Sequence, residues 1–286
     1  MTRRGLWARL ARQRMVVVGG LLVATFACVA MVSAVYTPHN PREVKLTAKN
    51  RPPGRHDEAL YAFGTDVVGR DILSRTMAGA RISLRVGLFV VTGAIVVGVA
   101  VGVLAGYHGG FVDTVLMRLM DMLLAVPGIL LAIVIVTVLG SGLRNAMIAV
   151  GIVAIPQYAR VMRAEVLRVK AQEYVAAARA LGASDWRILR RAVLPNCLAP
   201  LLVQATLGMG TAILETAGLS YLGLGDEASV PEWGRMIAEQ FGYLRRAWWT
   251  VVPPLASISL VVLGFNLLGD GLRDALDPRL RQLPRS

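Results

Sequence analysis

At residues 86–107 the chain reads VGLFVVTGAIVVGVAVGVLAGY, an apolar stretch without a single charged side chain. An α-helix rises 1.5 Å per residue, so roughly 20 apolar residues cross a hydrocarbon core about 30 Å thick. The stretch is long enough for this purpose. It predicts a transmembrane helix.

Five further stretches also lack charged residues. They occupy residues 15–36, 122–143, 145–159, 192–214 and 247–269. Only the fourth of the six stretches, 145–159, is too short, so either Arg144 extends its side chain to the interface or the helix continues past Arg160. Charged residues make up 17% of the chain, against about 25% in soluble domains. The sequence predicts an all-α polytopic membrane protein with six transmembrane helices and a lipid bilayer as its surroundings.

The first apolar stretch follows five arginines, as the hydrophobic part of a secretory signal peptide would. Signal hydrophobic regions contain about 7 to 15 residues and end before a small-x-small cleavage site. The stretch at 15–36 is longer and no clean site follows it. We therefore expect a retained helix.

The formal net charge of +13 could indicate nucleic-acid binding. The basic residues are spread between the apolar stretches, however, and no nucleic-acid-binding motif occurs, so we expect no nucleic-acid partner. The positive-inside rule instead places the arginine-rich amino-terminal tail, residues 160–191 and the carboxyl terminus in the cytoplasm. The first outer loop, 37–81, resists this rule with eight basic residues, although five acids accompany them.

This topology divides the chain into two parts. Residues 1–82 hold the basic tail, the first helix and the first outer loop, in which prolines and glycine at 52–54 predict an irregular backbone. Residues 83–286 hold five helices and a cytoplasmic segment at 160–195. We expect both termini in the cytoplasm.

Small residues recur every fourth position in the second apolar stretch. They are Ala94, Gly98, Gly102 and Gly106. Residues at this spacing share one face of a helix, and small side chains there let two helices approach closely in lipid. The stretch predicts a packing face against another helix of this chain or of a partner, unless the glycines are merely tolerated.

Signatures of catalysis are missing from the sequence. None of the three lysines follows a glycine, so the chain lacks the Gly-Lys-Ser/Thr end of a phosphate-binding loop. The three histidines, His39, His56 and His108, lie apart in loops without metal-ligand spacing. We expect no catalytic residue, no bound cofactor and no metal in this chain.

The cytoplasmic segment has a local pattern of its own at residues 173–195, EYVAAARALGASDWRILRRAVLP. An alanine-rich helix is expected to end at Gly182, a left-handed C-cap, and a second helix to begin with Ser184 or Asp185 as N-cap. Small side chains allow such a helix to enter a groove of a partner closely. The alternative is a surface loop without a partner.

The segment resembles the signature of binding-protein-dependent ABC permeases, which reads Glu-Ala-Ala, three residues, Gly, nine residues, Ile, any residue, Leu, Pro. The positions that align with it are Ala176, Ala177, Ala178, Gly182, Ala192, Val193, Leu194 and Pro195. Two of them depart from it, since the family prefers glutamate at Ala176 and isoleucine at Ala192. Glu173 lies one helical turn before Ala176 and could substitute for the missing acid.

Other segments resemble the C-type permeases of dipeptide, oligopeptide and nickel importers. They are residues 63–75, 79–84, 117–121 with Pro127, 219–225 and 265–278. The resemblance implies that the chain is one permease half of an importer in a bacterial or archaeal cytoplasmic membrane. It also implies a homologous second permease forming a heterodimer, two ATPase subunits or domains that bind ATP and Mg²⁺, and an extracytoplasmic substrate-binding protein.

The residues then expected to couple to the ATPases are Glu173, Ala176, Ala177, Ala178, Gly182, Leu194 and Pro195. Dipeptides or oligopeptides are the expected substrates, with nickel or glutathione as alternatives. An ion-coupled secondary transporter is the alternative of another class, since proton or sodium coupling needs ionisable residues within the spans. Glu215 and Asp121 are the candidates for this role or for the pathway, although we expect Glu215 to pair with an outer arginine or to cap a polar contact. A membrane scaffold without transport is a third alternative, but it would leave the cytoplasmic segment unexplained.

Overall fold

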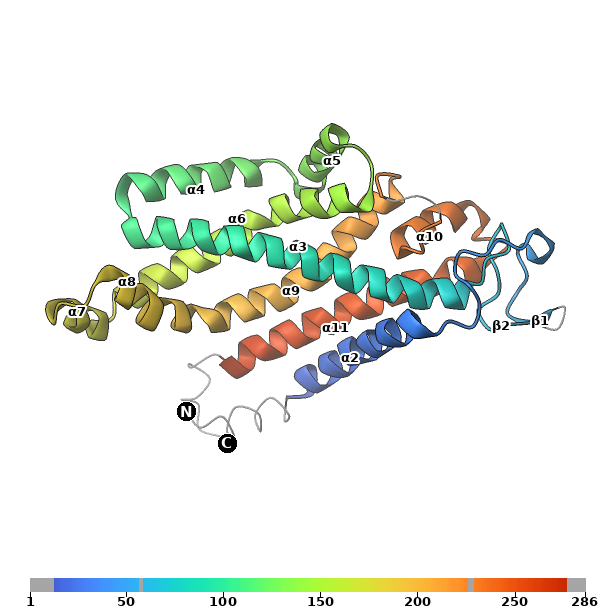
Figure 1. Ribbon diagram of the computed structural model, residues 1–286, viewed down its shortest axis with the longest axis horizontal. Coiled ribbons are helices and arrows are strands. Elements are labelled where there is room, and N and C mark those ends of the chain that lie inside the picture. The colour runs from blue at the N-terminus through green and yellow to red at the C-terminus, as the bar shows by residue number, and fades with distance from the viewer. Residues whose placement is uncertain (1–12, 57–58, 226–228, 277–286) are drawn as a thin grey trace.

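The computed structural model describes residues 13–56, 59–225 and 229–276, and within them the chain is almost entirely helical (Figure 1). Five helical stretches are long and apolar enough to cross a membrane. They are α2 (Arg14–Val35), α3 (Ile72–His108), α6 (Leu143–Lys170), the stretch Asp185–Tyr221 that contains α9 (Leu194–Tyr221), and the stretch Trp248–Leu276 that contains α11 (Val252–Leu276). The all-α membrane fold is confirmed.

The expected third span is not one straight helix. It is divided between α4 (Gly110–Ala125) and α5 (Gly128–Leu139), whose axes meet at 93°. Val126 adopts an extended conformation because the residue before a proline is disfavoured in the helical region, and Pro127 becomes the N-cap of α5. The described chain thus has five spans, or six if the bent pair is counted as one.

The fourth apolar stretch is completed in one of the two expected ways. Helix α6 continues past Arg160 for a further ten residues, to Lys170. Arg160 Nη2 lies 2.6 Å from Asp121 Oδ1 of α4, and Arg163 Nε lies 2.5 Å from Asp113 Oδ1 of the same helix. The charges of α6 therefore bind the acids of α4.

Helices α3 and α6 form the most extensive helix pair of the bundle. The small-residue face of α3 points at α6: a Cβ added to Gly102 would lie 2.5 Å from the carbonyl oxygen of Ala159 and 2.7 Å from Met162 Cβ. Gly98 and Gly106 meet α6 one turn to either side, and Ala94 is buried. The helix against which this face packs belongs to the same chain.

One end of the molecule carries the connections between α2 and α3 and between α9 and α11 (Figure 1). The first is not wholly irregular, since it contains a 3-10 turn η1 (Leu46–Ala48) and an antiparallel pair of strands, β1 (Gly54–His56) and β2 (Ala59–Tyr61). The second contains α10 (Trp233–Gln240), η3 (Phe241–Tyr243) and η4 (Trp248–Thr250).

The opposite end carries the short helices that follow α6 (Figure 1). They are α7 (Glu173–Ala180), α8 (Asp185–Ile188) and a π-helical turn η2 (Leu189–Val193) that leads directly into α9. Their position at the tip of the bundle separates them from the connections at the other end by the length of the long helices (Figure 1).

Candidate functional site

The turn between α7 and α8 has a defined hydrogen-bond pattern. The Gly182 N–H donates to the Arg179 carbonyl and the Ala183 N–H donates to the Ala178 carbonyl, each at 3.0 Å. This is the Schellman pattern, which ends a helix with a left-handed residue, and Gly182 has φ +81°. Ser184 is the N-cap of α8, but its side chain makes no capping hydrogen bond.

Helix α7 has one buried side chain that packs against the bundle. Val175 is buried and packs in a cluster with Ile188, Val193 and Cys197. The rest of the helix is open, because Glu173, Ala176 and Ala177 are exposed and Ala178 is half-buried. Beyond the helix, Leu181 and Trp186 keep 89% and 67% of their surface exposed.

The residues of the proposed signature belong to two helices and the turns beside them. Ala176, Ala177, Ala178 and Gly182 lie together on α7 and its turn, whereas Leu194 and Pro195 lie in the first turn of α9, beyond η2. Pro195 has no backbone N–H to donate, and the turn that leads into it, η2, is π-helical and not α-helical. Glu173 lies in the first turn of α7, where a carboxylate is favoured by the helix dipole.

A polar cluster that sequence reasoning missed attaches this end to α3 and α6. Tyr107 Oη donates to Asp185 Oδ1 at 2.6 Å, and Lys170 Nζ donates to the Tyr107 carbonyl while lying 4.9 Å from the centre of its ring. Arg179 also reaches Asp185, at 3.5 Å. Together with Trp186 these residues line an open groove of about 800 Å³. Their sequence separation hides the cluster, because Tyr107 and Asp185 are 78 positions apart in the chain.

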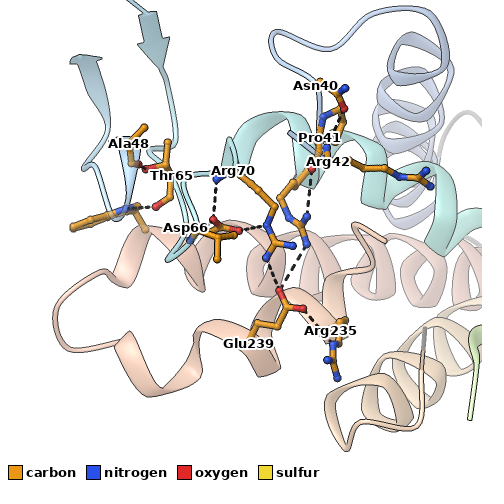
Figure 2. A network of polar contacts seen from close by, with 12 residues as sticks. Asn40, Pro41, Arg42, Ala48, Thr65, Asp66, Arg70, Arg235 and Glu239 are labelled. Atoms are coloured by element: carbon orange, nitrogen blue, oxygen red, sulfur yellow. Dashed lines mark hydrogen bonds and ion pairs between the residues drawn. The ribbon is translucent and has the colours of Figure 1, made fainter. Parts of the chain in front are cut away.

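The end of the bundle opposite α7 is held by a buried network of ions, shown in Figure 2. Arg70 lies between two carboxylates, with Nε 2.5 Å from Asp66 Oδ2 and Nη2 2.7 Å from Glu239 Oε2 of α10. Arg75 is 1% exposed and approaches Glu239 at 3.9 Å, and Arg235 approaches the same carboxylate at 3.3 Å. The charged residues of the segment 63–75 therefore fasten the connection between α2 and α3 to α10.

Helix α10 is also fixed to the start of α3 by its first residues. The Trp233 indole N–H donates to the Thr76 carbonyl at 3.0 Å, and a Cβ on Gly79 would collide with the indole ring. The Glu232 carboxylate accepts from the Gly234 and Arg235 N–H groups at 3.0 and 2.8 Å. Burial raises the pKa of Glu232, an effect that these two hydrogen bonds oppose.

The two acids proposed for the pathway lie in different surroundings. Asp121 pairs with Arg160 across α4 and α6, and both side chains are about half exposed. Glu215 lies on α9, half-buried, and no arginine or hydrogen-bond donor among the described residues pairs with it. It lines a recess with Gln157 and Tyr158 of α6.

These features define a class of protein: a polytopic helical membrane subunit that exposes a short helical segment at one end of its bundle. Residues 98–282 match the family described as the binding-protein-dependent transport system inner membrane component, and the chain belongs to this family. The resemblance drawn from the sequence is confirmed. Membership supports the expectation of a non-catalytic membrane subunit.

Relatives match nearly the whole chain. The dipeptide transport system permease protein DppC of Alkalihalophilus pseudofirmus is 45% identical over 278 residues, covering 97% of this chain and 90% of the relative. The glutathione transport system permease protein GsiD of Pectobacterium atrosepticum is 40% identical over 279 residues, covering 97% and 91%. A chain of the methionine ABC transporter MetNI, solved in inward facing conformations, shares the fold at a TM-score of 0.57 and 22% identity, over 70% of this chain and 95% of that one.

Proposed function

We propose that this chain is one permease half of an ATP-driven importer of dipeptides or oligopeptides. The observation that carries the proposal is the 45% identity to a dipeptide permease over almost the full length of both chains. The identity to a glutathione permease is lower, at 40%, and glutathione remains the second candidate substrate. Nickel is the third.

The exposed turn after α7 supports a partner at that end of the molecule. An alanine face and two exposed apolar side chains, Leu181 and Trp186, would be costly to leave in water and are suited to burial in a groove. In the proposed importer this groove belongs to an ATPase subunit or domain, which binds ATP and Mg²⁺. In this proposal ATP and Mg²⁺ bind to the partner and not to this chain.

The remaining assembly follows from the same proposal. A second homologous permease completes the pathway as a heterodimer, an extracytoplasmic binding protein delivers the peptide, and α7 lies in the cytoplasm with both termini. ATP binding moves the ATPases and α7 together, and the spans rock as rigid bodies so that a cavity between the two permeases opens outward. Hydrolysis returns the spans to the inward-facing state.

Reconstitution tests this function. Proteoliposomes that contain the chain with its second permease and ATPases are expected to take up radiolabelled dialanine, and only with both ATP and the binding protein. The purified chain alone should neither hydrolyse ATP nor transport dialanine. ATP hydrolysis by the pure single chain, or uptake that needs an ion gradient instead of ATP, would contradict the proposal.

A further inference from the structure

A stripe of polar and small residues runs along one face of α9 within the membrane. Gln204, Gly208, Thr211 and Glu215 follow each other at spacings of four, three and four residues, which places them on the same helical face. Across from the stripe, Gln157 of α6 lies close enough for a weak hydrogen bond from Gln204 Nε2, at 3.4 Å.

The stripe borders a recess between α3, α6 and α9. Valines 90, 91, 150 and 153 form apolar walls, and the polar lining consists of Gln157, Tyr158, Thr211 and Glu215. The recess measures about 20 Å³, which is enough for one group of the size of a water molecule.

Two polar groups of the recess lack partners. The hydroxyl of Tyr158 is buried, its residue is 1% exposed, and it has no hydrogen-bond partner. Gly208 makes room for it, because a Cβ at that position would collide with the hydroxyl oxygen. Glu215 likewise has no hydrogen-bond or ion-pair partner within the described parts of the chain.

An unpaired carboxylate at this depth is costly, since α9 continues beyond Glu215 for six residues, or about 9 Å. The cost falls when a cation binds. An ammonium group carries one positive charge and three N–H donors, and the recess offers three acceptors to it: the carboxylate of Glu215, the hydroxyl of Tyr158 and the amide oxygen of Gln157. An ammonium group is also close to water in size.

We propose that this recess binds the terminal ammonium group of a peptide as it passes through the pathway, with Glu215 as its counter-ion. The inference rests on the proposed peptide transport. It assigns Glu215 a role in specificity: substrates with a free amino terminus gain an ion pair that acetylated peptides cannot form.

Photolabelling of the assembled transporter tests the inference. The complex of both permeases and the ATPases is placed in nanodiscs without nucleotide or binding protein, and is irradiated with an alanyl dipeptide whose second side chain carries a diazirine. The same probe with an acetylated amino terminus is the control ligand. Labelling of α9 is measured by mass spectrometry of its tryptic fragment.

We expect Glu215→Gln to lower labelling by the free-amino probe about tenfold, as loss of a charge-assisted contact requires, and to leave the weaker labelling by the acetylated probe unchanged. Glu215→Asp should restore part of the difference in labelling between the free-amino and the acetylated probe. Leu214→Ala, at the neighbouring exposed position of α9, should label like the wild type.

Three results would overturn the inference: absence of α9 labelling in the wild type, equal labelling by both probes, or a loss in Glu215→Gln that affects both probes alike. The last would indicate a purely structural role, or a pairing of Glu215 with the second permease. Dialanine uptake by the wild-type proteoliposomes separates the two proposals. If dialanine is taken up but one of these three labelling results is found, only the proposed ammonium site is rejected. If dialanine is not taken up, the proposed peptide-import function is rejected.

Discussion

Gly182 and Gly223 occupy the same position in two copies of one local structure. Gly223 follows α9 with φ +85°, and the N–H groups of Gly223 and Leu224 donate to Ser220 and Leu219 in the pattern seen after α7. A Cβ would meet no atom within 4 Å at either glycine. The two positions differ in their surroundings alone, because one lies at the exposed α7 turn and the other at the opposite end of the bundle.

Replacement of each glycine by valine is therefore a matched pair of variants. Both replacements force a β-branched residue into the left-handed region, at a cost of about 1–2 kcal/mol. We expect both proteins to reach the membrane at similar abundance, and only Gly182→Val to lose co-purifying ATPase subunits and dipeptide uptake. Equal retention of the ATPase by the two variants would remove the proposed coupling role of the α7 turn.

The buried ion network supplies a second prediction at this scale. Asp66 is 1% exposed, and its carboxylate accepts from the N–H groups of Val68 and Arg70 besides pairing with the Arg70 guanidinium. Asp66→Ala should destabilise the folded protein by about 3 kcal/mol, because removal of one partner of a buried pair leaves charge and donors poorly satisfied.

The matched control is Glu43→Ala in the same loop, where the acid pairs with Lys45 at 3.4 Å and both side chains are exposed. Glu43→Ala should lower the free energy of unfolding by at most about 0.5 kcal/mol. Thermal unfolding in detergent measures both variants. A midpoint for Asp66→Ala that is no lower than that for Glu43→Ala would show that the network does not stabilise the fold.

At the level of helices, the close approach of α3 and α6 depends on glycine. Gly102 and Gly93 lie on the same helix, but a Cβ on Gly102 would contact α6 and a Cβ on Gly93 would meet nothing within 4 Å. We expect Gly102→Val to separate the two helices and to reduce both membrane abundance and the thermal midpoint, and Gly93→Val to behave like the wild type. Equal stability of the two variants would mean that α3 and α6 can shift apart without loss.

The helices also show how far the sequence alone can be interpreted. Charge-free length identified α2, α3, α9 and α11, because each has a long run of apolar residues. The length of a charge-free run did not reveal the bend between α4 and α5, because such a run is equally apolar whether its helix is straight or bent by 93° at Val126 and Pro127. The proline was the available signal, but its effect depends on the backbone of the residue before it.

The candidate sites also include one that the sequence predicts and others that it does not. The Gly182 turn could be predicted because a Schellman motif is local, with all its hydrogen bonds within six residues. The groove around Tyr107 and Asp185, and the recess at Glu215, depend on contacts between helices that are distant in sequence. Gln157 and Gln204, which face each other beside that recess, are 47 residues apart.

For the whole molecule, the predicted orientation must account for the first outer loop, residues 37–81, whose eight basic residues oppose the positive-inside rule. The structure gives a physical reason to discount several of them. Arg70 and Arg75 are buried in the network with Asp66 and Glu239, so their charges are directed into the protein and away from lipid headgroups. Lys45 has Glu43 as a neighbour at 3.4 Å. By contrast, Arg187, Arg190 and Arg191 near α8 are exposed.

Cysteine labelling tests the resulting topology, in which the exposed arginines face the cytoplasm. Arg55 and Arg187 are both exposed, and the elements that carry them, β1 and α8, lie at opposite ends of the bundle (Figure 1). In a background with Cys28 and Cys197 replaced by alanine, we expect Arg55→Cys to react with an impermeant maleimide in intact cells, whereas Arg187→Cys should react only after the membrane is permeabilised. The same labelling can test which charges set the orientation.

If orientation depends on the exposed arginines near α8 and not on the loop 37–81, Arg42→Gln combined with Lys49→Gln should leave the labelling pattern unchanged. Replacement of Arg187, Arg190 and Arg191 by glutamine, with the labelling cysteine at position 55, should instead yield a fraction of molecules with the opposite pattern. Labelling of Arg187→Cys in intact cells that otherwise carry the wild-type charges would invert the topology, and would place the α7 turn where no cytoplasmic ATPase could reach it.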